Sequence, residues 1–245
     1  MLNLIAAFFV CSGIGIAVWI IYDLSRHKQS MKIMNAVWVL SALWGGYFVL
    51  WAYNKFGREQ IQMKMDDRSM MMESPRSFWQ SVSLSAFHCG AGCTLADILG
   101  EWITYCIPVH INGNLLLGSW VIDFILALII GVYFQFYAIR EMEKISVSQG
   151  LFRAFKADFF SLTSWQIGMY GWMAVVYFIL FKGISVEKDT WLFWFMMQIA
   201  MFFGFICAYP MNIFLIKSRL TTSEGTPVSS NLDFTVTRSQ VFPSL

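Results

Sequence analysis

One segment, HCGAGCTLADILGEW, brings together five side chains suited to metal or redox chemistry. Four of them follow one another at intervals of four residues: Cys89, Cys93, Asp97 and Glu101. Residues four apart share one face of an α-helix, so these side chains form a stripe that runs from thiols to carboxylates. His88 lies about 100° away around the helix. Thiolates and imidazoles bind copper(I) and zinc, so the segment is a candidate metal site.

The same segment lies in a long apolar run, Phe78–Ile107, where charged groups are costly. An Asp at the centre of a membrane-spanning helix costs about 2.5–3.5 kcal/mol on insertion scales. Such residues usually face the interior of a helix bundle or a wet cavity. We therefore predict that the stripe faces the bundle interior, with Asp97 as the deeper carboxylate. Asp123, in the next apolar run, is a further candidate.

Three chemical interpretations fit this pattern. In the first, Cys89, Cys93 and His88 bind a soft metal ion. In the second, the two cysteines form a redox pair that exchanges electrons with a quinone, since cysteines one helical turn apart have Cα atoms about 6 Å apart, within the disulfide range. In the third, the cysteines are small packing residues, His88 and Asp97 satisfy each other between helices, and the protein is a structural or assembly subunit of a larger complex.

Two methionine pairs extend the metal hypothesis to other apolar runs. They are Met169 with Met173, and Met197 with Met201. Each pair presents two thioethers on one helical face, a pattern similar to that of copper uptake channels, and thioethers prefer copper(I). Methionine also fills gaps in ordinary cores, so the alternative is packing.

The composition excludes a soluble fold. Hydrophobic residues make up 58% of the chain and charged residues 13%, against roughly 25% charged in soluble domains. The net charge of +2 implies no nucleic-acid partner. A membrane-spanning helix needs about 20 apolar residues. We predict an all-α, polytopic transmembrane helix bundle over residues 1–220, with a flexible polar tail over 221–245. Six spans are expected near residues 2–22, 33–53, 78–107, 115–139, 159–181 and 191–216.

Loop charges predict the orientation. Lys and Arg concentrate after the second, fourth and sixth spans, which places both termini in the cytoplasm by the positive-inside rule. The basic residues of Arg26–Lys32 lie on the wrong side in this arrangement. We expect an integral protein of a bacterial cytoplasmic membrane. The chain lacks nucleotide-binding glycine motifs, GxSxG and HExxH, so we do not expect a common enzyme class.

The segment HCGAGCTLADILGEW resembles the signature of a bacterial membrane family of unknown function. KADFFSLTSWQIGMYGWM and YPMNIFLIK are similar to two further stretches of that family, and together the three cover about the last two-thirds of the chain before the tail. Members are sometimes joined to multicopper-oxidase-type domains, so the resemblance implies a link to copper and to a copper-protein partner. It marks as signature positions His88, Cys89, Cys93, Asp97 and Glu101. The Met-rich stretch Met63–Met72 and the Ser/Thr tail depart from it.

The leading prediction is binding or translocation of a soft cation, with copper(I) first and zinc as the alternative. Cys89 and Cys93 are the expected thiolate ligands, with His88 third. Asp97 is expected to balance charge, and Glu101 to receive or release the cation at the membrane surface. The expected partners are the lipid bilayer, the metal ion and a membrane or copper protein.

Overall fold

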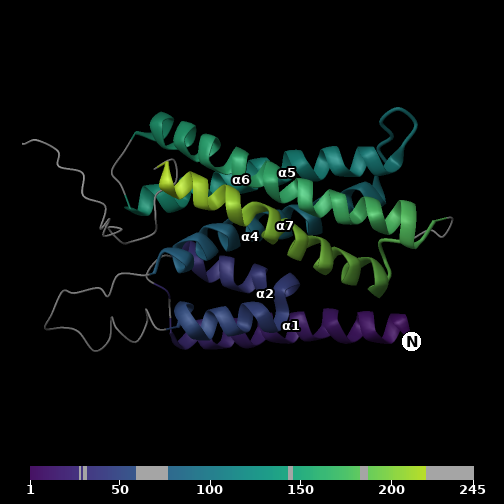
Figure 1. The fold of residues 1–245 in the computed structure, drawn as a ribbon, viewed down its shortest axis with the longest axis horizontal. Helices are drawn as coiled ribbons and strands as arrows, with labels where there is room; N and C mark the ends of the chain where they lie inside the picture. The colour runs from purple at the N-terminus through teal and green to yellow at the C-terminus, as the bar shows by residue number, and fades with distance from the viewer. Residues whose placement is uncertain (28, 30–31, 59–76, 143–145, 183–186, 219–245) are drawn as a thin grey trace, which may run out of the picture.

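Long helices run side by side along one axis in the computed structural model, which describes residues 1–27, 29, 32–58, 77–142, 146–182 and 187–218 (Figure 1). The elements are α1 (Leu2–Arg26), α2 (Lys32–Ala52), η1 (Tyr53–Gly57), α4 (Phe78–Cys106), α5 (Leu115–Met142), α6 (Val147–Val175), η2 (Val176–Leu180) and α7 (Trp191–Lys217). The predicted all-α transmembrane bundle is confirmed. Met63–Met72 and the tail 221–245 lie outside the described residues.

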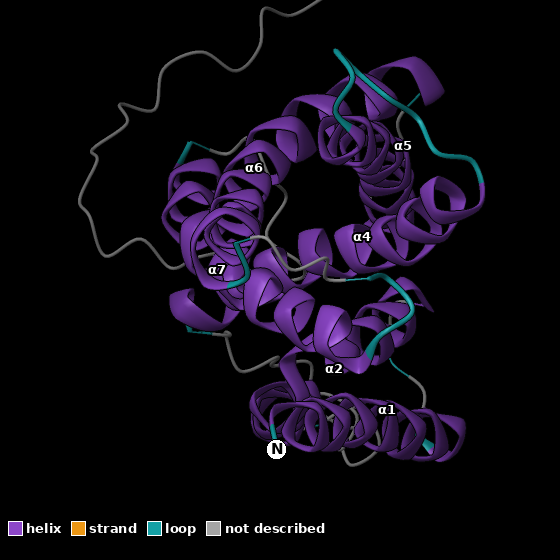
Figure 2. Cartoon of the chain, turned by 90° about the vertical axis from the view of Figure 1, so that its right-hand side faces the viewer, coloured by secondary structure: helices purple, strands orange, loops and turns teal. Residues whose placement is uncertain are grey.

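Helices α4 to α7 surround a common centre, with α2 and then α1 stacked on one side (Figure 2). Neighbours in this ring run antiparallel and touch through aromatic rings and glycines. The ring centroids lie 5.3 Å apart for Phe87 and Phe205 (α4, α7), 4.8 Å for Trp120 and Tyr170 (α5, α6) and 4.9 Å for Trp172 and Phe203 (α6, α7). Between α4 and α5, a Cβ on Gly92 would come within 3.3 Å of the Gly131 Cα.

The bundle exposes large apolar side chains and buries several polar ones among its core residues. Ile167 of α6 and Ile179 of η2 are 67% and 70% exposed, whereas Asp158, Ser161 and Gln166 of α6 are buried. A soluble protein shows the opposite pattern, so this surface is suited to lipid. Five segments are long and apolar enough to cross a membrane: Leu2–Arg26, Lys32–Gly57, Phe78–Cys106, Leu115–Arg140 and Trp191–Lys217. Helix α6 falls outside this group because its inward face is polar, yet it runs alongside α7.

Helix α6 begins well before the predicted span at residue 159. Its N-cap is Ser146, whose side chain accepts a hydrogen bond from the Gln149 backbone N–H. The first turns carry Arg153 and Lys156 and lack the continuous apolar character of a span. Hydropathy therefore underestimates a helix whose first turns extend beyond the hydrocarbon core.

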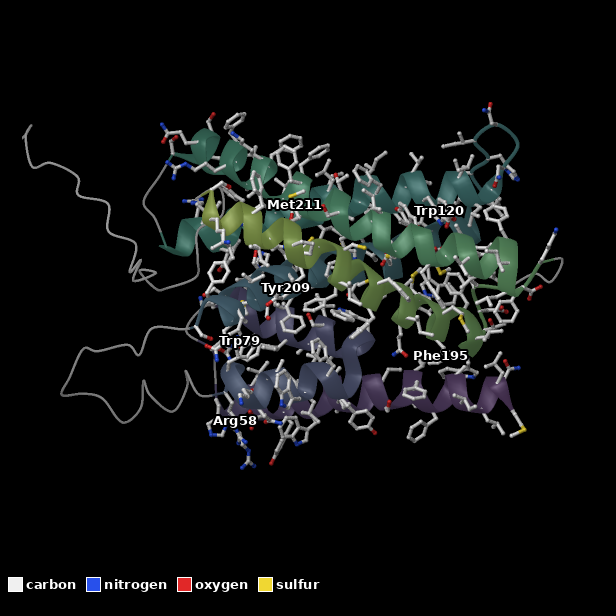
Figure 3. The ribbon with its side chains drawn as sticks, viewed as in Figure 1. Arg58, Trp79, Trp120, Phe195, Tyr209 and Met211 are labelled. Atoms are coloured by element: carbon white, nitrogen blue, oxygen red, sulfur yellow. The ribbon has the colours of Figure 1, made fainter. Side chains whose placement is uncertain are left out.

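The second predicted span does not cross the bundle. Helix α2 is broken at Gly46, where φ is +46° and ψ is −123°. A straight helix would separate Trp38 from Tyr53 by about 22 Å, but their ring centroids lie 5.4 Å apart. Arg58 accordingly lies at the same end of the bundle as Trp79, the second residue of α4 (Figure 3). The segment Lys32–Gly57 is a re-entrant helical hairpin, although its length and composition would allow it to cross a membrane.

Protein atoms satisfy both ends of this hairpin, as buried irregular backbone in a membrane requires. At its tip, the Gln198 side chain donates to the Leu43 carbonyl over 2.6 Å. At its base, the Asp23 carboxylate accepts from Tyr53 Oη over 2.7 Å and pairs with Arg58 over 3.1 Å. The break at Gly46 thus removes helical hydrogen bonds that neighbouring helices partly replace.

The re-entrant hairpin changes the topology. Phe9 of α1 packs on Phe195 of α7 at 5.4 Å, and Gly13 lies beside Gln198, so α1 and α7 run parallel. The start of α1 and the end of α7 therefore lie at opposite ends of the bundle (Figure 1). The prediction of both termini in the cytoplasm counted the hairpin as a crossing, and it stays a prediction.

Gly46 should be difficult to replace. An alanine there must adopt backbone angles that L-residues rarely occupy, so Gly46→Ala is expected to lower the free energy of unfolding by about 1–3 kcal/mol. Gly15→Ala is the matched control, since it lies within helical α1 with open space around an added Cβ. The control is expected to be neutral or stabilising. Denaturant titration in detergent micelles measures both, and equal effects would contradict the role given to Gly46.

The reversal also predicts which residues share a membrane surface. In a protein with the exposed Cys11 and Cys106 replaced by serine, Arg26→Cys and Lys55→Cys should react with an impermeant maleimide from the same side. Lys182→Cys, at the other end, should react only from the opposite side. Labelling of Arg26→Cys and Lys55→Cys from opposite sides would show that Lys32–Gly57 crosses the membrane.

Candidate functional site

The α4 stripe, which we define as Cys89, Cys93, Asp97 and Glu101, is buried along its whole length, with each residue at most 4% exposed. It faces the bundle interior, as predicted. Glycines on α4 allow its neighbours to approach closely. A Cβ on Gly90 would overlap the Trp165 ring of α6. The same ring lies against Gly204 of α7, so Trp165 fills the space between α4 and α7 at this level.

One end of the stripe is closed by a lysine from the loop before α7. Lys188 Nζ forms an ion pair with Glu101 and donates hydrogen bonds to Thr104 Oγ1 and Ser119 Oγ, each over 2.7 Å. Ser119 Oγ in turn donates to Thr104 Oγ1 over 3.0 Å. An ammonium has three donors, so each of them has an acceptor here. Asp123 of α5 lies beside this group, because its carboxyl approaches Gly100, the residue before Glu101.

A short turn holds Lys188 in this position. The Thr190 backbone N–H donates to the Glu187 carbonyl over 3.1 Å, and the Thr190 hydroxyl donates to the same carbonyl over 2.6 Å. Thr190 is also the N-cap of α7, and its side chain accepts from the Phe193 N–H over 3.2 Å. The turn is therefore anchored to α7, and Lys188 leads from it into the bundle.

Two carboxyl groups on neighbouring helices each lie over a glycine. A Cβ on Gly100 of α4 would overlap Asp123 Oδ1, and a Cβ on Gly131 of α5 would overlap the Asp158 carboxyl. Both aspartates are buried. Glycine therefore provides the space that each carboxyl occupies between the helices.

A small polar cavity lies toward the other end of the stripe. It is lined by Ser85, Cys89, Gln135, Ala157, Asp158, Ser161 and Asn212. Ser85 Oγ donates to Asn212 Oδ1 over 2.8 Å, and Asn212 Nδ2 donates to Ser161 Oγ over 2.9 Å. The cavity has room for about one water molecule. It brings a thiol of the stripe together with a carboxyl from α6.

The other predicted ligands, His88 and four methionines, are also buried. The His88 ring packs edge-on against Phe134 of α5, with centroids 6.1 Å apart. The four methionines are buried in the core: Met169, Met173, Met197 and Met201. Within the described ranges, no three His, Cys, Asp or Glu side chains are close enough to hold one metal ion together. The soft donors that the stripe itself presents are Cys89 and Cys93, both free thiols.

Several buried polar atoms have no hydrogen-bond partner among the described residues. They include both carboxyl oxygens of Asp97, Oδ1 of Asp123 and Oδ2 of Asp158. Buried polar groups are usually paired, and exceptions tend to mark sites for water, ions or chemistry. These acceptors extend from the Lys188 group to the small cavity, on α4, α5 and α6.

Residues 78–220 match the profile of a family described as a domain of unknown function, DUF4396. The chain belongs to this family. Comparisons with curated proteins and with solved structures find no match. The DUF4396 domain begins at the first residue of α4 and ends just after α7. It therefore contains the stripe, the lysine and the cavity, whereas α1 and the re-entrant hairpin lie outside it.

Sequence analysis missed several polar residues of the DUF4396 domain that meet the stripe. Lys188 and Asp158 were not predicted as site residues. Gln135 and Asn212 were not considered as site residues, although polar side chains within apolar runs are a usable signal. No sequence pattern distinguishes a loop lysine that turns inward from one that faces water.

Gly131 offers a test of this packing. Gly131→Ala places a methyl group on the Asp158 carboxyl, and overpacking of this kind costs about 1–3 kcal/mol. We expect a lower free energy of unfolding in micelles, measured by denaturant titration. Gly171→Ala on α6 is the control, because nothing lies within 4 Å of its added Cβ. A Gly131→Ala protein as stable as this control would show that Asp158 does not pack over Gly131.

Proposed function

We propose that helices α4 to α7 bind a soft cation and pass it across the membrane, with copper(I) as the first candidate cargo. The observation that carries this proposal is the buried α4 stripe, which faces Asp123 and Asp158 from two other helices. Intramembrane ionisable groups of this kind mark ion pathways. The stripe offers a ligand at each helical turn, and conduction needs several weak sites in sequence.

Charge balance supports a cation. Four carboxyl groups are buried in the DUF4396 domain, on Asp97, Glu101, Asp123 and Asp158. Among the described residues, the cationic side chain paired with this group is that of Lys188. An isolated ionised carboxylate in an apolar medium is strongly unfavourable, so the others must hold protons or meet cations. A pathway for anions would require more buried cationic side chains than buried carboxyl groups.

The thiol pair favours copper(I) over zinc. Structural zinc sites use four protein ligands and catalytic sites use three. The stripe presents two thiols one turn apart, and His88 packs away on Phe134. Thiolates bind both ions, so the small number of protein ligands is what favours copper(I). Cys89 and Cys93 are the proposed ligands, with Asp97 one turn further along the path.

The proposed orientation places the end of α7 in the cytoplasm. With the hairpin returning to its own side, the described basic residues at that end are Arg26, Lys32, Lys55, Arg58, Arg140, Arg153, Lys156 and Lys217. Lys182 and Lys188 lie at the opposite end. The positive-inside rule then holds without the exception at Arg26–Lys32. Lys188 and Glu101 thus lie at the outer surface of a bacterial cytoplasmic membrane.

A thiol oxidoreductase is the second candidate. Cys89 and Cys93 are both free and lie one turn apart, a separation within the range for a disulfide. This function requires no metal and predicts a reversible disulfide between the two residues. Intact-mass measurement before and after mild oxidation would detect that bond.

Metal content tests the proposal. Protein purified under reducing conditions, loaded with copper(I) and dialysed should retain near-stoichiometric copper, measured by mass spectrometry. Cys89→Ser with Cys93→Ser should remove most of it, because both thiolate ligands are lost. Cys207→Ser is the control, since its sulfur lies against Gly168 on the α6–α7 contact. Copper retained by the double variant, or absent from the wild type, would refute copper(I) binding at the stripe.

A further inference from the structure

We infer that the Lys188 ammonium occupies an outer cation site of the pathway, and that a cation arriving from that side must displace it. The inference rests on the proposed function and adds the site where the cation is received and the residue that guards it. The outer site is formed by Glu101, Thr104 and Ser119, with Asp123 beside them over Gly100, on α4 and α5.

The helices assemble these oxygen ligands without help from the lysine. Thr104 Oγ1 donates to the Gly100 carbonyl over 2.8 Å, which directs its lone pairs toward the site. Ser119 is held by its hydrogen bond to Thr104. Asp123 fits because position 100 is glycine. An oxygen-lined site with two carboxyl groups is therefore built into α4 and α5, and it suits a cation of small size.

The site also has more acceptors than the ammonium uses. All three Lys188 donors are taken by Glu101, Thr104 and Ser119. Asp123 Oδ1 stays buried with no partner among the described residues. One turn deeper, both oxygens of Asp97 are likewise unpartnered. These further acceptors are not needed to anchor a lysine. A cation that moves inward from Glu101 does need them, as its next ligands.

Lys188 is held by a different kind of element from the four oxygen ligands. The four oxygen ligands belong to long helices, whereas Lys188 belongs to the turn before α7. Its side chain is 16% exposed, against 5% for that of Glu101, so it reaches the site from the membrane surface. A lysine has four rotatable side-chain bonds and can leave without any helix moving. The structure thus contains a tethered cation that blocks one end of an acidic path.

Silver(I) provides a probe of access from that side, because it binds thiols. The full chain carries Cys11→Ser, Cys106→Ser and Cys207→Ser, so that Cys89 and Cys93 are the remaining thiols. Right-side-out and inside-out membrane vesicles are exposed briefly to silver(I), and the remaining free thiols are counted with maleimide after denaturation. Lys188→Gln should raise the reaction rate about tenfold or more, since a blocked state typically opens in a tenth or less of molecules.

The increase should occur only when silver(I) is added on the side of Trp191. Lys188→Arg, which keeps the cation, should react as slowly as the parent protein. Lys182→Gln, an exposed lysine at the same end, should also leave the rate unchanged. Equal rates for Lys188→Gln and the parent, or an increase from both sides, would overturn the inference.

A second variant covers the case in which Lys188→Gln does not fold, as judged by its melting temperature. Thr104→Val with Ser119→Ala removes two of the three acceptors and keeps Lys188 and Glu101. Faster reaction from the Trp191 side supports displacement, and an unchanged rate refutes it. Copper content is measured separately, so loss of the proposed copper site and loss of the Lys188 block give different results.

Discussion

The cost of an uncompensated charge in the bilayer governs this structure. Carboxyl groups at Asp97, Glu101, Asp123 and Asp158 lie inside a bundle whose outer surface is apolar. Each must be protonated or paired, because an isolated carboxylate in hydrocarbon is strongly unfavourable. Among the described residues of the DUF4396 domain, the cationic partner of this group is Lys188, which belongs to a loop. Lys188 thus pairs with the carboxyl group at one end, Glu101, while oxygens of Asp97, Asp123 and Asp158 have no hydrogen-bond partner among the described residues.

Glycine makes the path geometrically feasible. Carboxyl groups between packed helices need space that a methyl group would fill, and Gly100 and Gly131 provide it on α4 and α5. The aromatic ring of Trp165 uses Gly90 and Gly204 in the same way. Small residues are common where membrane helices meet, because van der Waals packing and hydrogen bonds drive their association. In this bundle the glycines also determine where a polar side chain fits between two helices.

The sequence predicts the helices better than it predicts their directions. Apolar runs locate helices at all six predicted ranges, since hydrophobic length is a local property. The reversal at Gly46 is not visible in hydropathy, because a re-entrant hairpin and a span have similar length and composition. Its signals were Gly45–Gly46 in the middle of the run and the misplaced basic cluster Arg26–Lys32. The conflict between Arg26–Lys32 and the positive-inside rule was therefore a sign that the second apolar run does not cross the bundle.

The site shows the same division between local and long-range information. Four-residue spacing on one helix predicts the α4 stripe, because helical periodicity alone places its members together. Lys188 lies 87 positions after Glu101 in the chain, and only tertiary folding brings the two side chains together. His88 shows that neighbours in sequence can face different partners. It is adjacent to Cys89 in the chain, yet its ring packs against Phe134.

The order of ligands along the bundle supports passage more than storage. Oxygen groups form the outer end at Glu101 and Asp123, thiols follow at Cys93 and Cys89, and oxygen groups return around the cavity at Asp158. A storage site gathers its ligands around one ion, and no such cluster occurs in the described part of the chain. Ligands at one-turn intervals hold a cation more weakly at each step, which allows it to move on. In the proposed pathway, the Lys188 ammonium paired with Glu101 would supply positive charge whenever no cation is bound.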